Sequence, residues 1–295
     1  MNHVRGLIKS NTVYEKGISG KGVVVCVLDT GLYPHMDFMA PKSRVIKFID
    51  FVQNRVSLYD DNGHGTHVAG IIGGNGKASG GKFMGVAPEA SFIILKVLDT
   101  SGEGTMTPIM RGLDWVVRNR ETYNIRIVNI SVGAVDGKKF DQNSDFVKKV
   151  EQVWNSGVVV IAAAGNDGPR PGSISAPGNS RKVITVGASD IFGQNGIYSG
   201  IGPLMDGTCI KKPDIVAPGY RITSCGLGQR NYVVKSGSSM STAVVSGGVA
   251  LLLSRYPEMS NREVKVRLKT SAMDLGYPHA RQGWGALCVK NSLPE

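Results

Sequence analysis

Short apolar runs alternate along this 295-residue chain with segments of helical periodicity, and this alternation most constrains its fold. The runs are rich in β-branched residues, and several are apolar at consecutive positions. That pattern is typical of parallel strands covered by helices on both faces. The predicted strands are 23–28, 45–49, 92–97, 125–130, 158–163 and 183–186. We therefore expect an α/β fold with three layers, in which a doubly wound, mostly parallel sheet is flanked by helices.

The segment 107–120 (TPIMRGLDWVVRNR) predicts the first of the amphipathic helices. Thr107 is the expected N-cap, and Pro108 suits the first helical position, where no backbone N–H is needed. One face of the helix would be apolar, and it consists of Ile109, Leu113, Val116 and Val117. Such a stripe indicates a helix that packs on the sheet.

Two further helices carry recognisable end signals. The segment 144–156 has an apolar stripe and is followed by Gly157, a typical C-terminal stop. Ser260 and Glu263 have the spacing of a capping box and predict a helix over 261–270.

The chain reads as a single domain over residues 1–295, with an N-terminal extension over about 1–17. Hydrophobic residues make up 41% of the sequence, which is enough for one large core. We find no internal repeat, low-complexity segment or linker that would divide the chain.

The net charge of +11 raises the question of a nucleic-acid partner. The basic residues, however, occur as dispersed pairs such as Lys138-Lys139, Lys148-Lys149 and Lys211-Lys212. This pattern favours a solvated surface of mixed charge, so we expect no nucleic-acid partner. The sequence also lacks a run of about 18 apolar residues, so we expect no membrane partner.

The cysteine pattern bears on the compartment. The chain has four cysteines and no CxxC pair, which argues against a zinc or redox motif. Cys26 lies in an apolar run and is expected to be a buried thiol. Cys209 and Cys225 would pair only if the fold brings them together, which the sequence leaves open. Since no signal peptide is apparent, we expect a cytoplasmic protein, or a secreted one if a leader and prodomain have been removed.

Polar residues follow three of the predicted strands. Asp29 follows 23–28, the triplet Ser131-Val132-Gly133 follows 125–130, and Asn166 follows 158–163. Each alone is a common turn residue. Ligands of open α/β sheets, however, bind outside the carboxyl ends of the strands, so these residues are candidates for a site.

Two more candidates lie at predicted helix starts. In DDNGHGTHVAGIIGG, His64 begins a helix, whereas His67 is expected to pack inside the protein rather than to bind a metal. In GSSMS, Ser239 stands at the mouth of an apolar helix. Ser241 occupies the place of the last glycine in G-x-S-x-G, which argues against an α/β-hydrolase elbow.

Five sequence blocks in this order resemble those of subtilisin-family serine proteases, and they extend from about residue 17 to residue 285. The blocks are VLDTGL, NGHGTHVAGII, GVAPEA, AAAGN and GSSMSTAVVSGG. Among subtilases, the chain is most similar to the short intracellular AprX-type members. The order Asp29, His64, Ser239 is also the order of the subtilisin triad.

The resemblance implies a serine endopeptidase that acts through an acyl-enzyme intermediate. Ser239 would be the nucleophile, His64 the general base and Asp29 the carboxylate that orients the imidazole. Asn166 matches the asparagine of the oxyanion hole. A chain that keeps this fold without activity is the alternative, and intact candidates at all four positions argue against it.

The resemblance also implies where a peptide substrate would bind. The partners would be protein or peptide substrates. Such a substrate would lie as an added strand between two segments of the chain. The implied binding residues are Gly102, Gly104, Met106, Ile109, Ser131, Val132, Gly133, Ala163, Ala164, Gly165 and Ser175. For Met106 and Ile109, core packing is the open alternative. Because no acidic residue is evident in the first pocket, we expect cleavage after uncharged residues of medium or large size.

No cofactor is expected for the chemistry itself. The resemblance implies a structural calcium ion near Asp37, although the loop expected to complete that site has no carboxylate. Secreted members of the family carry a long prodomain, whereas only about 20 residues precede the first matching block here. The sequence does not indicate an oligomeric state.

Overall fold

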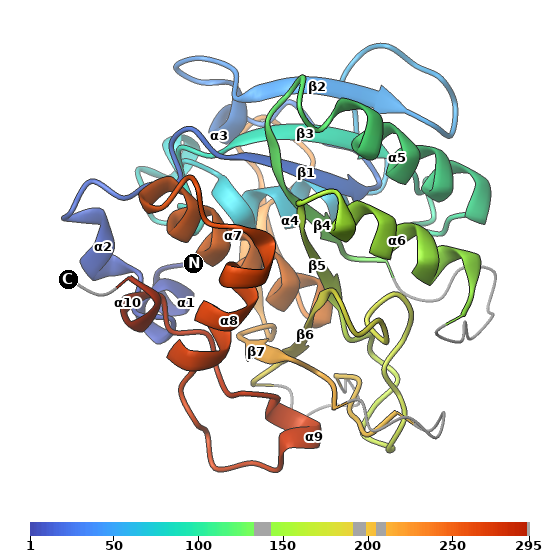
Figure 1. Cartoon of the computed structure of the whole chain (residues 1–295). Coiled ribbons are helices and arrows are strands. Elements are labelled where there is room, and N and C mark those ends of the chain that lie inside the picture. Colours follow the sequence, from blue (N-terminus) through green and yellow to red (C-terminus); the bar gives the residue numbers. More distant parts are fainter. Residues whose placement is uncertain (133–142, 191–198, 205–210, 294–295) are drawn as a thin grey trace.

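A seven-stranded sheet forms the centre of the computed structural model, which describes residues 1–132, 143–190, 199–204 and 211–293 (Figure 1). The strand order is β2-β3-β1-β4-β5-β6-β7, and every pair of neighbours is parallel. The strands are β1 (Val24–Asp29), β2 (Val45–Asp50), β3 (Ser91–Lys96), β4 (Ile125–Ile130), β5 (Val159–Ala163), β6 (Ile184–Ala188) and β7 (Ile215–Ala217). The expected parallel α/β sheet is confirmed.

Helices cover both faces of the sheet, which gives the three expected layers (Figure 1). Helices α5 (Met106–Asn119) and α6 (Asp145–Asn155) pack together on one face. Helices α4 (His64–Gly73) and α7 (Ser238–Arg255) pack together on the other. The smaller elements are α1 (Asn2–Leu7), α2 (Asn11–Tyr14), α3 (Met36–Met39), the 3₁₀ turn η1 (Lys77–Ser79), α8 (Asn261–Ser271), α9 (His279–Gln282), α10 (Val289–Ser292) and the antiparallel hairpin β8 (Ile222–Cys225) and β9 (Tyr232–Lys235).

Burial explains the sequence patterns of these elements. Strand β1 is buried at every residue, because it lies inside the sheet with helices on both sides. Helix α7 is buried at every residue from Ser238 to Leu253, so it lacks a polar face, as expected for a central helix. Edge strand β2 is only half buried, and Ile46 is 46% exposed.

The six strands predicted from the sequence are present; β4 has the predicted bounds, and the bounds of the others differ by one or two residues. Strands β7, β8 and β9 were not predicted. Each has only three or four residues, which is too short for its apolar pattern to stand out from the flanking loops.

The helix ends follow the predicted signals in two cases of three. The capping box of Ser260 and Glu263 is confirmed at the start of α8, and Gly157 follows α6 with a φ of 93°. The predicted N-cap at Thr107 was wrong, because Thr105 is the N-cap of α5. Pro108 still lies in the first turn, where a missing N–H breaks no helical hydrogen bond.

The predicted N-terminal extension contributes to the main core. Val4, Ile8 and Val13 are buried within it, and the N–H of Val289 donates to the carbonyl of Ile8 at 2.8 Å. Helices α1 and α10 accordingly lie on the same side of the molecule (Figure 1).

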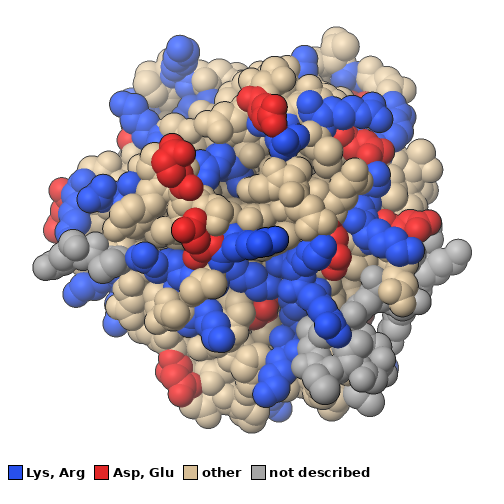
Figure 2. All heavy atoms as spheres, viewed as in Figure 1, with Lys and Arg blue, Asp and Glu red and all other residues tan. Residues whose placement is uncertain are grey.

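On the face shown in Figure 2, Asp and Glu side chains lie among the Lys and Arg side chains, as expected of a mixed surface. The pair Lys138-Lys139 lies outside the described residues. Of the helices that the structure describes, none combines the length and the apolar character needed to cross a membrane.

Three cysteines are described, and all of them are free and buried. Cys26, on β1, is the buried thiol that the sequence predicts. Cys209 lies outside the described residues, and Cys225, the other cysteine of the pair that the sequence left open, is a free thiol.

The capping box of α8 predicts a measurable loss of stability. Ser260→Ala removes the acceptor of the Glu263 N–H, so the free energy of unfolding should fall by about 1 kcal/mol. Equilibrium unfolding in urea measures this. As a control, Lys269→Ala on the exposed face of α8 should change stability by less than about 0.5 kcal/mol. Equal effects of the two variants would contradict the capping role.

Candidate active site

The three polar strand ends meet at one edge of the sheet. Strands β1, β4 and β5 are parallel neighbours, so their carboxyl ends lie side by side. Asp29 is the last residue of β1, Ser131 follows β4, and Asn166 lies three residues beyond β5. This is the edge at which open α/β sheets bind ligands.

The imidazole of His64 is hydrogen-bonded to the carboxylate of Asp29. The distance from His64 Nδ1 to Asp29 Oδ1 is 2.7 Å, and the Asp29 side chain is fully buried. Close approach of α4 to β1 requires Gly65, since a Cβ atom there would overlap the carbonyl of Gly31. With Nδ1–H donating to the carboxylate, Nε2 is the nitrogen that can accept a proton.

Two opposing effects set the pKa of His64. Burial lowers it, and the charge and hydrogen bond of Asp29 raise it. The carboxylate prevails, so the pKa of His64 lies above its ordinary value of 6.5. The imidazole therefore accepts a proton readily at neutral pH.

Ser239 is the second residue of α7, and its hydroxyl donates to the carbonyl of Ser131 at 3.1 Å. A chain of side-chain hydrogen bonds joins α7 to β4 and to Ser131. Ser246 donates to Asn129 at 2.9 Å, and Asn129 donates to the Ser131 hydroxyl at 2.8 Å. Because a hydroxyl carries one proton, Ser239 must leave the Ser131 carbonyl before it can donate to His64.

The amide of Asn166 has a defined orientation. Its Oδ1 accepts the backbone N–H of Ser238 at 2.9 Å, so the NH₂ group is the part that can donate to a ligand. The N–H of Ser239 lies in the first turn of α7 and has no acceptor within the helix. Two N–H donors are thus available beside the Ser239 hydroxyl.

The residues expected to form the first specificity pocket are small and adjacent. Ala163 and Ala164 are buried, and the N–H of Ser175 donates to the carbonyl of Ala164 at 3.0 Å. Gly165 has a φ of +87°, and a Cβ atom there would overlap Ser175 Oγ. That hydroxyl is buried and has no partner among the described residues. Val132 lies beside Ser131, and Gly133 falls outside the described residues.

The second predicted substrate segment follows β3. Gly102 lies close to the side chain of Asn62: a Cβ atom at Gly102 would be 3.2 Å from the Asn62 amide nitrogen. Gly104 packs more closely still, because a Cβ atom there would come within 2.6 Å of Leu98 Cδ2. Met106 is partly exposed, whereas Ile109 is 1% exposed and belongs to the main core. The core-packing alternative thus describes the position of Ile109, and Met106 packs against the same core from a partly exposed position.

Sequence reasoning missed Asp60, which accepts five hydrogen bonds. Its Oδ1 accepts from Thr30 Oγ1 and from the N–H groups of Asn62 and Gly63, and its Oδ2 accepts from the N–H and the hydroxyl of Thr66. Burial opposes the charged carboxylate, but these bonds lower its pKa. No clear signal in the sequence pointed to it, because Asp60 lies three residues before the N-cap Gly63, outside the positions at which acidic residues mark a helix start.

His67 is a packed residue, as predicted. It is fully buried, and its Nε2 lies 3.0 Å from the carbonyl of Ile222 and 3.2 Å from that of Val233. Both neighbours are acceptors, so Nε2 carries the proton. Burial lowers the pKa of His67 to about 3, so the ring is neutral and joins α4 to the β8–β9 hairpin.

The surroundings of Asp37 do not fit a calcium ion. The carboxylate is fully buried, and it accepts from the Ala78 N–H at 2.9 Å and from the Tyr232 hydroxyl at 2.8 Å. The Cys225 thiol lies 3.6 Å away on the same side as Tyr232. Calcium takes six to eight oxygen ligands, whereas both oxygens of Asp37 face hydrogen-bond donors.

The sequence profile of the Peptidase S8 family, the subtilase family, matches residues 20–285. The chain belongs to the subtilase family. It is 39% identical to serine protease AprX of Bacillus subtilis (strain 168), over 94% of this chain and 67% of that protein. It is 36% identical to a thermostable alkaline protease of Halalkalibacterium halodurans, over 92% and 68%.

A solved structure of a cold adapted subtilisin-like serine proteinase matches with a TM-score of 0.73 and 29% identity, over 94% of this chain and 91% of that one. Together with the family match, this shows that the chain is a subtilisin-like serine endopeptidase. Enzymes of this family work through an Asp-His-Ser triad.

The contact between Asp29 and His64 predicts the pH dependence of this subtilase. Hydrolysis needs the neutral imidazole, so kcat/KM should rise with pH through a midpoint above 6.5. In Asp29→Asn the amide cannot raise the pKa of His64, so the midpoint should move to lower pH. The kcat should also fall about 10⁴-fold.

Initial rates on a chromogenic peptide amide between pH 5 and 10 measure both effects. Asp145→Asn is the control, because this carboxylate is 89% exposed at the start of α6 and should leave the profile unchanged. An unshifted midpoint in Asp29→Asn would contradict the assigned contact.

Proposed function

We propose that Asp29, His64 and Ser239 are the triad of this endopeptidase and that it cleaves proteins after uncharged residues of medium or large size. One observation carries the proposal. The buried Asp29 carboxylate holds His64 at 2.7 Å, at the sheet edge where α7 presents Ser239.

Acylation begins with proton transfer. The Ser239 hydroxyl leaves the Ser131 carbonyl, gives its proton to His64 Nε2, and its oxygen attacks the carbonyl carbon of the scissile bond. Asp29 stabilises the imidazolium that forms. His64 then gives the proton to the departing amine as the C–N bond breaks, which leaves the acyl group on Ser239.

Deacylation repeats these steps with water. His64 takes a proton from water, and the resulting hydroxide attacks the ester carbon. When the C–O bond to Ser239 breaks, His64 returns the proton to the serine oxygen and the carboxylic acid leaves. In both halves of the reaction the proton is carried by the same nitrogen, His64 Nε2.

The negative charge that develops on the carbonyl oxygen needs donors in fixed positions. The NH₂ group of Asn166 and the N–H of Ser239 are the proposed donors. Asn166 is held by the Ser238 N–H and needs no reorganisation when the charge appears. The N-terminal end of α7 adds its positive dipole.

Substrate would bind as an extended strand between two segments, Gly102–Gly104 and Ser131–Gly133. The side chain before the scissile bond would enter the pocket of Ala163, Ala164, Gly165 and Ser175. None of these residues is charged, so a buried Lys or Arg of the substrate would lack a counter-charge. This supports the preference for uncharged residues.

Incubation with denatured casein, followed by mass spectrometry of the fragments, tests the function and the specificity together. We expect wild type to generate fragments that end in uncharged residues of medium or large size. Ser239→Ala should generate none above background, whereas Ser241→Ala should remain active, because Ser241 has no part in the proposed chemistry. Equal activity of wild type and Ser239→Ala, or fragments ending mainly in Lys or Arg, would contradict the proposal.

Removal of the Asn166 amide should lower kcat with little change in KM, because this amide stabilises charge that appears only in the transition state. Asn166→Leu should lower kcat about 10²- to 10³-fold on a peptide amide substrate. Steady-state kinetics separate the two constants. A raised KM with an unchanged kcat would indicate that Asn166 binds the substrate uniformly and is not an oxyanion donor.

A further inference from the structure

A fully buried lysine, to which the sequence analysis gives no role, lies beside the proposed triad. Lys96 is the last residue of β3, and its side chain has no exposed surface. Its neighbours in the sheet are Asp29 on β1 and Asp50 on β2. A buried ammonium group is costly unless every N–H finds an acceptor and a counter-charge is close.

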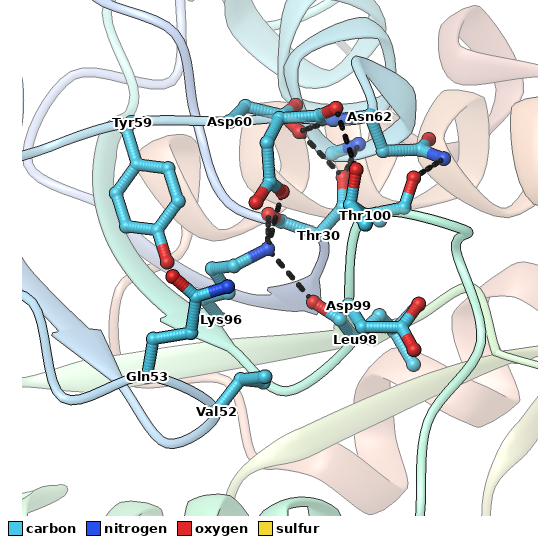
Figure 3. Close-up of polar contacts among 12 residues, drawn as sticks. Thr30, Val52, Gln53, Tyr59, Asp60, Asn62, Lys96, Leu98, Asp99 and Thr100 are labelled. Carbon is cyan, nitrogen blue, oxygen red and sulfur yellow. Dashed lines mark hydrogen bonds and ion pairs between the residues drawn. The ribbon is translucent and has the colours of Figure 1, made fainter.

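The ammonium group of Lys96 uses its three N–H donors on three acceptors (Figure 3). Lys96 Nζ lies 2.7 Å from the carbonyl of Thr30, 2.9 Å from the carbonyl of Leu98 and 2.7 Å from the carboxylate of Asp61. The ring of Tyr59 lies 5.2 Å from Nζ and shields the group further. The donors of the lysine are therefore fully used.

Each acceptor belongs to a segment that carries part of the proposed machinery. Thr30 follows Asp29 directly, and Asp61 lies in the loop that leads to His64. Leu98 begins the segment that leads to Gly102. One cation thus joins the segments of the acid, the base and a substrate edge.

Further hydrogen bonds tie these segments to one another (Figure 3). Thr30 Oγ1 donates to Asp60 and accepts the N–H of Gly65 at 2.9 Å. Asn62 accepts the N–H of His64 at 3.1 Å and donates to the carbonyl of Thr100 at 3.1 Å. Lys96 is the charged centre of this network, so its loss would loosen all three segments together.

We propose that Lys96 is a positioning residue, whose ammonium group fixes the Asp29 turn and the loop before His64 relative to each other and to the substrate segment. The inference rests on the proposed triad. Lys96 acts through Asp29 and His64 and does not touch the substrate. Its removal should therefore lower kcat more than it raises KM.

Lys212 provides a matched control for the general cost of removing a buried lysine. Its side chain is 1% exposed, and its ammonium group contacts Asp214 at 2.6 Å and the carbonyl of Val183 at 3.0 Å. Val183 and Asp214 precede β6 and β7, at the amino ends of the strands and opposite the proposed site. Substitution of either lysine should lower stability, but only substitution of Lys96 should also lower kcat.

The experiment compares Lys96→Met and Lys212→Met with wild type. The readouts are the Tm, kcat and KM on a peptide amide, and the rate of inactivation by a small fluorophosphonate. We expect both variants to lose thermal stability. Lys96→Met should also lose about 10²-fold in kcat, as a misplacement of about 1 Å would cause, with KM changed less than threefold.

The fluorophosphonate separates the alignment of the triad from substrate binding, because it reacts at the nucleophile without filling the extended subsites. Its rate should fall in Lys96→Met in proportion to kcat and stay unchanged in Lys212→Met. Wild-type kcat in a folded Lys96→Met, or equal kcat losses in both variants, would overturn the proposal.

Asp61 gives a second test if Lys96→Met does not fold. Its side chain is 28% exposed, so Asp61→Ala removes the counter-charge at the surface end of the network. We expect a fall in kcat with Asp61→Ala and a smaller fall with Asp61→Asn, which keeps an acceptor. An unchanged kcat in Asp61→Ala would overturn the role of Lys96. An inactive wild type would instead refute the proposed function itself.

Discussion

The hydrogen bond between Asp29 and His64 is the interaction on which the proposed chemistry depends. It joins the end of the central strand β1 to the start of α4, two elements between which the chain forms α3, β2 and a long loop. Oδ2 of the buried carboxylate has no hydrogen-bond partner among the described residues, whereas Oδ1 accepts from the Thr30 N–H and from the imidazole. The same contact fixes the tautomer of His64 and raises its pKa, so one bond prepares both the geometry and the basicity of the imidazole.

Around this bond, the rigidity of the site comes from buried polar groups whose hydrogen bonds are made within the protein. Asp60 holds the start of α4, Lys96 joins three loops, and Asn129 joins β4 to α7. Such networks fix one arrangement strongly, because breaking any bond leaves a buried group unsatisfied. Ser239 differs from them. Its hydroxyl rests on a backbone carbonyl and is free to turn to another acceptor.

The sequence predicted the sheet, its layers and the residues at its carboxyl edge, because apolar runs and strand ends are local features. The buried contacts could not be predicted in the same way. Lys96 looks like an ordinary strand end until Asp61 and Leu98 are placed around it by the fold. The calcium expected at Asp37 came from resemblance alone, and donors on Ala78 and Tyr232, distant in sequence, face that carboxylate instead. The cellular compartment and the cleavage specificity stay predictions.

The central claim is that the chain has many serines and the fold turns only one of them, Ser239, into a nucleophile. Reaction of the folded wild-type protein with diisopropyl fluorophosphate, followed by intact mass measurement and peptide mapping, tests it most directly. The account predicts one phosphoryl group per chain, located on Ser239, and none on the neighbouring Ser238 or Ser241. A folded protein that stays unmodified, or one that carries the group on another serine, would contradict it.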